Sequence, residues 1–214
     1  MTRKSDKNAH LLVEGKNDQH VIWALCKLHQ VPETFDVLVP EDGGLEAVLA
    51  DIPIRLKEAG LQALGVVIDA DEDIRIRWQS LRTRLQQAGY SLPSRLSPNG
   101  FAASPSNRPR IGVWIMPDNR LPGILENFVT QLIPANDPLR SVAEDTLQSI
   151  EQRGLHRYQI PHRPKALIHT WLAWQEAPGM PMGQAITARA LQYDAATANR
   201  FVNWLQTLFI GEEQ

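Results

Sequence analysis

Apolar and polar positions alternate along the first 130 residues in blocks that predict short strands separated by helices. The expected strands are residues 10–14, 35–39, 64–68 and 111–116. The expected helices are residues 18–30, 45–59, 74–87 and 123–132, with Pro53 as a kink or break in the second. The run 64–68 is continuously apolar, as in a parallel strand that is covered on both faces. This alternation predicts a mainly parallel α/β sheet wrapped by helices.

The rest of the chain predicts one long loop and a helical end. Residues 89–110 contain four prolines and five serines, which favours a loop. After residue 135 the pattern is mostly helical, over roughly 139–152, 164–176 and 184–209. We therefore expect an α/β core over residues 1–135 and a helical extension over residues 136–214 that packs on it.

Acidic residues follow three of the expected strands. Glu14 ends the first strand, Asp69 and Asp71 follow the third, and Glu126 lies just past the fourth. Neighbouring parallel strands lie about 4.8 Å apart, so carboxylates at their ends can share one or two hard cations. Asp73 can face the same side, because alternate residues of an extended segment point the same way. Oxygen ligands of this kind favour Mg²⁺ or Mn²⁺.

Two segments resemble the Toprim domain, which is shared by topoisomerases, bacterial primases, a ribonuclease that matures small ribosomal RNA, and the overcoming-lysogenization-defect (OLD) nucleases. The segments are V-E-G-K-N-D at 13–18 and V-I-D-A-D-E-D at 67–73. The resemblance implies a doubly wound sheet and Mg²⁺ as cofactor. Glu14 matches the family's glutamate, Asp69 and Asp71 match its aspartate pair, and Asp73 matches a third acid found in some members.

The sequence is most similar to OLD-type nucleases and to short bacterial Toprim proteins. That resemblance assigns Asp18 as a second acid after the glutamate, Glu126 as a later metal ligand, and Lys165 as a distal lysine that stabilises charge. Asp118 remains an alternative to Glu126. The chain lacks the ATPase domain of OLD proteins, so the resemblance implies that any ATPase is a separate polypeptide.

Each acid also has a simpler interpretation. Asp69 or Asp71 could cap the helix that begins near Ile74, and Asp18 lies in a first helical turn, where the helix dipole favours an acid. Capping needs one acid, however, whereas three acids within five residues repel one another unless a cation compensates them. Metal binding is therefore the preferred interpretation.

Charge is balanced over the chain but not within its segments. The formal net charge is −2, yet residues 74–110 contain seven arginines and no acid. We expect this segment to contact a nucleic-acid backbone, although a solvated helix face is the simpler alternative. The arginines assigned to this contact are Arg75, Arg77, Arg82, Arg84, Arg108 and Arg110. The aromatic residues among them, Trp78, Tyr90 and Phe101, could stack on bases, but a tryptophan at helical spacing is more often part of a core.

Composition excludes several other classes. The single cysteine, Cys26, excludes an intramolecular disulfide and a multi-cysteine zinc site. No apolar run approaches the roughly 20 residues that span a bilayer, and the first ten residues lack the apolar stretch of an export signal. We expect a cytoplasmic protein that binds DNA or RNA and has no membrane partner, and that could form a homo-oligomer.

The function expected from these features is a Mg²⁺-dependent nucleic-acid phosphodiesterase, with antiphage defence as a setting that the resemblance suggests. Glu14 would complete the metal site or act as general base. The alternative is a Toprim subunit that is silent until it docks on a separate ATPase. The C-terminal helix around Trp204 could be its docking surface, although core packing is the preferred interpretation of that helix. A third interpretation is a domain that binds polyphosphate ligands without chemistry.

Overall fold

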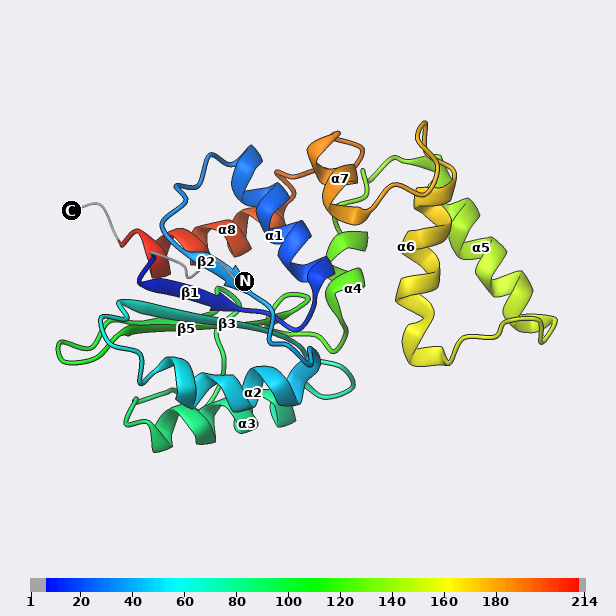
Figure 1. Ribbon diagram of the computed structural model, residues 1–214. Coiled ribbons are helices and arrows are strands. Elements are labelled where there is room, and N and C mark those ends of the chain that lie inside the picture. Colours follow the sequence, from blue (N-terminus) through cyan, green and yellow to red (C-terminus); the bar gives the residue numbers. More distant parts are fainter. Residues whose placement is uncertain (1–6, 212–214) are drawn as a thin grey trace.

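A five-stranded sheet lies at the centre of the protein, between two layers of helices (Figure 1). The computed structural model describes residues 7–211. The strands are β1 (Ala9–Leu12), β2 (Asp36–Leu38), β3 (Ala63–Asp69), β4 (Phe101–Ala103) and β5 (Arg110–Met116). Their order is β2-β1-β3-β5-β4, and all neighbours are parallel except β4 and β5. The predicted fold class, a doubly wound and mainly parallel α/β sheet flanked by helices, is confirmed.

Four helices cover the sheet: α1 (Lys16–Leu28), α2 (Gly44–Arg55), α3 (Ile74–Gln87) and α8 (Ala196–Phe209). Side chains alternate between the two faces of a strand, so each central strand contributes residues to two hydrophobic cores, one on each face of the sheet. Leu64 and Val66 of β3 pack in the core under α2 and α3. Val67 and Trp114 point to the other face and join the core that includes α1 and α8. No helix in the described part of the chain is long and apolar enough to cross a membrane.

Helix α8 lies in a notch made by two glycines. Gly65 of β3 and Gly112 of β5 are register partners, so two missing side chains adjoin on one face of the sheet. A Cβ added at Gly112 would lie 2.5 Å from Leu208 Cδ2, and one added at Gly65 would lie 3.0 Å from the same atom. The notch therefore lets α8 approach the strands closely. Helix α8 is the last part of the segment expected to be a helical extension, and it packs on the α/β core.

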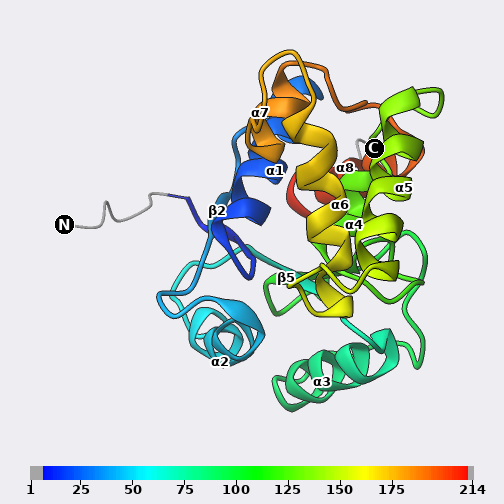
Figure 2. The ribbon, with the colours of Figure 1, turned by 90° about the vertical axis from the view of Figure 1, so that its right-hand side faces the viewer.

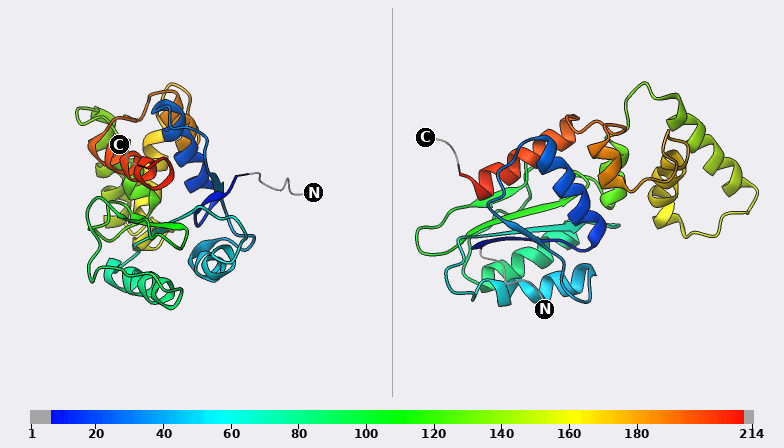
Figure 3. Two further views of the ribbon diagram at one scale, coloured as in Figure 1. Left: turned by 90° about the vertical axis from the view of Figure 1, so that its left-hand side faces the viewer. Right: turned by 45° about the horizontal axis from the view of Figure 1, so that its top comes forward.

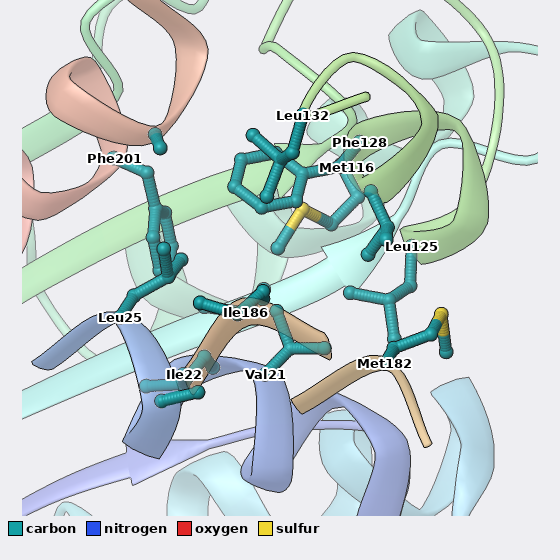
Figure 4. Packing of buried hydrophobic residues seen from close by; sticks show 14 of the residues in the cluster. Val21, Ile22, Leu25, Met116, Leu125, Phe128, Leu132, Met182, Ile186 and Phe201 are labelled. Carbon is teal, nitrogen blue, oxygen red and sulfur yellow. The ribbon is translucent and has the colours of Figure 1, made fainter. Parts of the chain in front are cut away.

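A helical arm lies beyond the carboxyl ends of the strands (Figures 1 and 2). Its elements are α4 (Leu125–Thr130), α5 (Pro138–Gln152), the short 3₁₀ helix η1 (Ile160–His162), α6 (Arg163–Ala173) and α7 (Met182–Thr187). Helix α7 returns to the core, where Met182 and Ile186 pack near Val21 and Ile22 of α1 (Figure 4).

Two predicted elements differ from the structure. The helix expected over 184–209 is wrong, because the chain divides it into α7 and α8. Arg189 has a left-handed φ of 62°, and the Gln192 N–H donates to the Leu132 carbonyl 2.7 Å away. These tertiary contacts turn the chain although no proline or glycine interrupts the segment. The loop expected over 89–110 contains the edge strand β4, which pairs antiparallel with β5.

Candidate metal centre

The direction of winding reverses at β1. Helix α1 leads from β1 to β2 on one side, and α2 then returns the chain to β3 on the other side of β1. In doubly wound sheets, ligands bind outside the carboxyl ends of the strands at such a switch point. Carboxylates from four separate segments meet there, and we call them the acidic cluster: Glu14, Asp18, Asp69, Asp71 and Glu126.

Glu14 links the ends of β1 and β3. It follows β1 by two residues, and its Oε1 accepts the Asp69 backbone N–H at 2.8 Å. Burial is the main cause that raises the pKa of Glu14, and the charge of Asp71 raises it further. The Arg77 and Lys165 side chains partly oppose this shift. Glu14 is therefore a carboxylate that is shielded from water and lies between acids and two cations.

Asp18 lies in the first turn of α1 on the helix's buried side, together with Val21, Ile22 and Leu25. Only 8% of it is exposed. Burial, and then the charges of Glu14 and Glu126, raise the pKa of Asp18 to about 7. Backbone N–H groups at the helix start lower it in part. The helix positions this acid inward, because the buried face of α1 continues to its first turn.

Asp69 is the centre of the cluster. It is the last residue of β3 and lies on the same face of the sheet as Val67, toward α1. Its Oδ1 accepts a hydrogen bond from the Leu125 N–H at 2.9 Å. Burial raises its pKa to about 9, and four further carboxylates add to the rise. In decreasing order these are Asp18, Glu14, Glu126 and Asp71. Asp69 therefore lies within electrostatic range of every other member of the cluster.

Glu126 and Lys165 meet across the arm. Glu126 lies in the first turn of α4 and is 4% exposed, and Lys165 Nζ at the start of α6 lies 3.8 Å from its Oε1. Glu151 of α5 fixes the chain before α6, because its carboxylate accepts from the Tyr158 hydroxyl at 2.7 Å and from Arg163 Nε at 2.8 Å. Glu126 and Lys165, which the resemblance assigned to the site and which are far apart in the sequence, therefore lie close together.

Asp118, the alternative to Glu126, has a local role. Its Oδ1 accepts the backbone N–H groups of Arg120 at 3.0 Å and Leu121 at 2.9 Å, so its carboxylate stabilises the turn after β5. The geometry favours Glu126 as the member of the cluster.

Asp71 and Asp73 differ from the expectation that both face the site beside Asp69. The strand ends at Asp69, and Asp71 has a left-handed φ of 50° with two backbone hydrogen bonds to Gly123. Its exposed carboxylate pairs with Arg77 at 2.6 Å. Asp73 caps α3 by accepting the Arg75 N–H, and hydrogen bonds from Arg75 lower its pKa to about 2. Asp73 is thus a helix cap rather than a member of the cluster, because the extended backbone that would align it stops too early.

The predicted arginines do not form one surface. Arg77 faces the cluster through Asp71, and its charge acts on Glu14. Arg75 is exposed and pairs with Asp73, whereas Arg84 donates to Ser80 within α3.

Among the described residues, the remaining three arginines, Arg82, Arg108 and Arg110, make no hydrogen bond or ion pair with the acidic cluster. Arg82 of α3 has its Nε buried without a hydrogen-bond partner among the described residues. Arg108 donates to the Ala88 carbonyl. Arg110 begins β5, at the end of the strand opposite the cluster, and donates to the Phe209 carbonyl at 3.1 Å. Arg108 and Arg110 therefore make contacts within the fold away from the cluster.

The aromatic residues expected to be candidates for stacking or docking are in the core. Trp78 and Tyr90 are buried, and Phe101 packs against Trp78 at 6.0 Å between ring centroids. Trp204 is buried too and donates to the Phe101 carbonyl at 2.9 Å. The face of α8 that includes Trp204 therefore packs on the sheet and is not a docking surface. Cys26 is largely buried, and burial raises its pKa to about 12.

A cleft of about 710 Å³ adjoins the cluster on the side of Asp71 and Arg77. Its apolar wall includes Ile76 of α3, Ile124 before α4 and Ile160 of η1. The sequence pattern did not predict Ile160 or its neighbours Pro161 and Pro164 as residues beside a site. The only signal for them is the I-P-H-R-P segment at 160–164, which by itself indicates only a break between helices.

The cluster offers only oxygen ligands. Among residues 7–211, no three His, Cys, Asp or Glu side chains are arranged to hold a metal ion as they stand. Mg²⁺ usually takes only one or two protein carboxylates and keeps waters and substrate phosphates as its other ligands. Glu14, Asp18 and Asp69, whose pKa values are raised, fit such an ion, because its charge would replace the protons that they otherwise hold.

Comparison with known protein families gives a match. The model of a family described as a protein of unknown function (DUF3226) matches residues 8–210, which include every strand and helix of the fold. No curated protein and no solved structure matches.

Proposed function

The chain belongs to the DUF3226 family, whose function is unknown, and we propose that it is a Mg²⁺-dependent nucleic-acid phosphodiesterase with a Toprim-type site. The observation that carries the proposal is the meeting of the buried Asp18 and Glu126 with the partly buried Asp69 at the switch point of the sheet. Natural folds rarely bury several carboxylates without compensation, because desolvation and repulsion both oppose their charged forms. The raised pKa values of Asp18 and Asp69 support the proposal, because strongly perturbed acids in such a place are typical of functional sites.

In this proposal the acids of the cluster would hold the ion. Asp69 lies at the centre, and Asp18 and Glu126 are the acids from the flanking helices. A bound Mg²⁺ ion supplies a more acidic water and neutralises charge on a phosphate. The match of Glu14, Asp69 and Asp71 to the Toprim pattern supports the same assignment.

Glu14 and Lys165 have roles that follow from their surroundings. Burial raises the pKa of Glu14, and a carboxylate with a raised pKa is a better base at neutral pH. Its Oε1 accepts the Asp69 N–H, so the carboxylate is held in one orientation and can take a proton from an attacking water. Lys165 is half exposed, and its ammonium group is placed to stabilise charge on a phosphodiester. Arg77 extends this positive surface into the cleft.

The proposal is tested with Asp69→Asn and a matched control, Asp73→Asn. Asparagine at 69 keeps an oxygen for the Leu125 N–H, so the local hydrogen bond survives while the charge is lost. Asparagine at 73 still caps α3. Mn²⁺ binding is measured by calorimetry, and cleavage of labelled DNA and RNA is measured with Mg²⁺ or Mn²⁺.

Wild type and Asp73→Asn should bind Mn²⁺ and cleave, whereas Asp69→Asn should lose binding and at least about 100-fold in rate. Cleavage by Asp69→Asn at the wild-type rate would refute the proposal. Mn²⁺ binding with cleavage only after a separate ATPase is added would instead support the conditionally active subunit.

A further inference from the structure

A second groove begins where α1 leaves the acidic cluster. It has a volume of about 670 Å³ and lies between α1 and α7. The two helices run side by side in this part of the molecule (Figures 2 and 3). Gly183 of α7 makes this possible, because a Cβ there would lie 2.6 Å from the His20 carbonyl oxygen. The groove therefore results from the close packing of α1 and α7 that Gly183 allows.

The α1 wall of the groove presents a stripe of exposed side chains. Lys16, His20, Trp23 and Lys27 are spaced by four, three and four residues, so they lie along one helix face. Trp23 is 48% exposed. The His20 ring meets it edge to face, with centroids 5.5 Å apart and an interplanar angle of 88°, and this contact orients the indole. The Trp23 indole therefore presents an exposed, oriented aromatic face beside the groove.

The groove's charge selects the kind of ligand. No acidic side chain lines it. Within residues 7–211, neither Lys16 nor Lys27 forms an ion pair. Two uncompensated lysines that flank an exposed tryptophan match the pattern of single-stranded nucleic-acid sites, in which lysines follow the phosphates and an aromatic ring stacks on an unpaired base. A duplex does not offer a base face to Trp23.

The length of the α1 stripe, and its continuity with the acidic cluster, agree with a single-stranded nucleic acid that lies along α1 and reaches the cluster. Lys16 lies two residues after Glu14, and Lys27 lies eleven residues farther along the helix. At 1.5 Å per residue the stripe is about 16 Å long, enough for roughly four or five stacked nucleotides. We propose that the α1/α7 groove binds a single-stranded segment of the nucleic-acid substrate, with a base stacked on Trp23 and phosphates on Lys16 and Lys27. This inference rests on the proposed phosphodiesterase function and adds its substrate class.

The test measures binding of fluorescein-labelled oligo-dT and oligo-U of twelve residues by anisotropy, with a DNA duplex of the same length for comparison. EDTA is present, so neither a metal ion nor cleavage contributes. The variants are Trp23→Leu, Trp23→Phe as the conservative replacement, and Lys16→Gln/Lys27→Gln. The matched controls are Trp174→Leu and Lys57→Gln, since both residues are exposed and neither lines the groove. Circular dichroism checks that each variant is folded.

Wild type should bind at least one of the single strands more tightly than the duplex. Trp23→Leu should weaken that binding about tenfold, and Trp23→Phe should restore most of it. The double lysine variant should reduce the salt dependence of log K by about 1.4, and both controls should match wild type. Equal binding by Trp23→Leu and wild type, or a preference for the duplex, would overturn the inference. So would a Trp23→Leu variant that changes self-association and not oligonucleotide binding.

The two proposals fail separately. If Asp69→Asn abolishes cleavage while Trp23→Leu binds and cleaves single strands as wild type does, the phosphodiesterase stands and the groove assignment falls. If oligonucleotides bind through Trp23 but no cleavage occurs with any metal, the groove assignment stands and the phosphodiesterase falls.

Discussion

Neutralising Asp69 should stabilise the protein when no metal is present. The fold keeps a proton on Asp69 up to a pKa of about 9, whereas the unfolded chain releases it near 3.8. Between these values ionisation favours the unfolded state, so the wild type loses up to about 1.4 kcal/mol of stability per pH unit as pH rises. Asparagine does not titrate, and Asp69→Asn therefore avoids this loss.

The expected advantage of Asp69→Asn is near zero at pH 4 and on the order of 4 kcal/mol at pH 7. For a chain of this size, this corresponds to a rise in Tm of roughly 10 °C. Thermal or urea unfolding followed by circular dichroism in EDTA, at pH 5, 6, 7 and 8, measures it. If the proposed metal site is correct, excess Mn²⁺ should then raise the stability of the wild type but not that of the variant, because only the wild type would keep the carboxylate proposed for the centre of that site.

Asp73→Asn is the control for this experiment. The pKa of Asp73 is lowered to about 2, so its carboxylate is ionised in both states above pH 5 and its replacement should give no advantage that grows with pH. If Asp69→Asn is no more stable than wild type at pH 8 in EDTA, then Asp69 is ionised in the fold. The carboxylates around Asp69 would then not destabilise the fold.

Three further outcomes are expected. Gly112→Ala should lower the free energy of unfolding by about 1–3 kcal/mol through its clash with Leu208, and Leu208→Ala should show a non-additive effect in a double-mutant cycle of urea denaturations. Glu151→Gln should speed tryptic cleavage in the segment before α6 several-fold, because Arg163 loses its charged partner; an unchanged digestion rate would contradict this. Mn²⁺ affinity should rise with pH from 6 to 8, since binding displaces protons from acids such as Asp18; calorimetry in buffers of different ionisation enthalpy should detect proton release.

The sequence predicts the central strands well because their information is local. A continuous apolar run at 64–68 becomes the buried strand β3, and the acids that follow it lie at the carboxyl end of that strand. Hydrophobic periodicity also places Asp18 on the buried side of α1. These features need only the period of the element and the general rule for doubly wound sheets.

Features that depend on tertiary contacts were not predictable in this way. Strand β4 has only three residues and exists because β5 offers it an edge. The division between α7 and α8 depends on the Leu132 carbonyl, which accepts from the distant Gln192. The roles of Asp73 and Asp118 as caps depend on where a strand stops and how a turn closes, and composition does not encode either.

The glycine notch is filled only late in synthesis, when α8 is made. Leu11, Gly65 and Gly112 are all made long before Leu208, so the part of the apolar sheet face that α8 covers stays open in the emerging chain until that helix is available. The interactions that close this face are among the most distant in the sequence, and such contacts slow folding and prolong exposure to aggregation. A truncated chain that ends before α8 would keep the acidic residues of the candidate site but would lack the helix that covers the sheet beneath them.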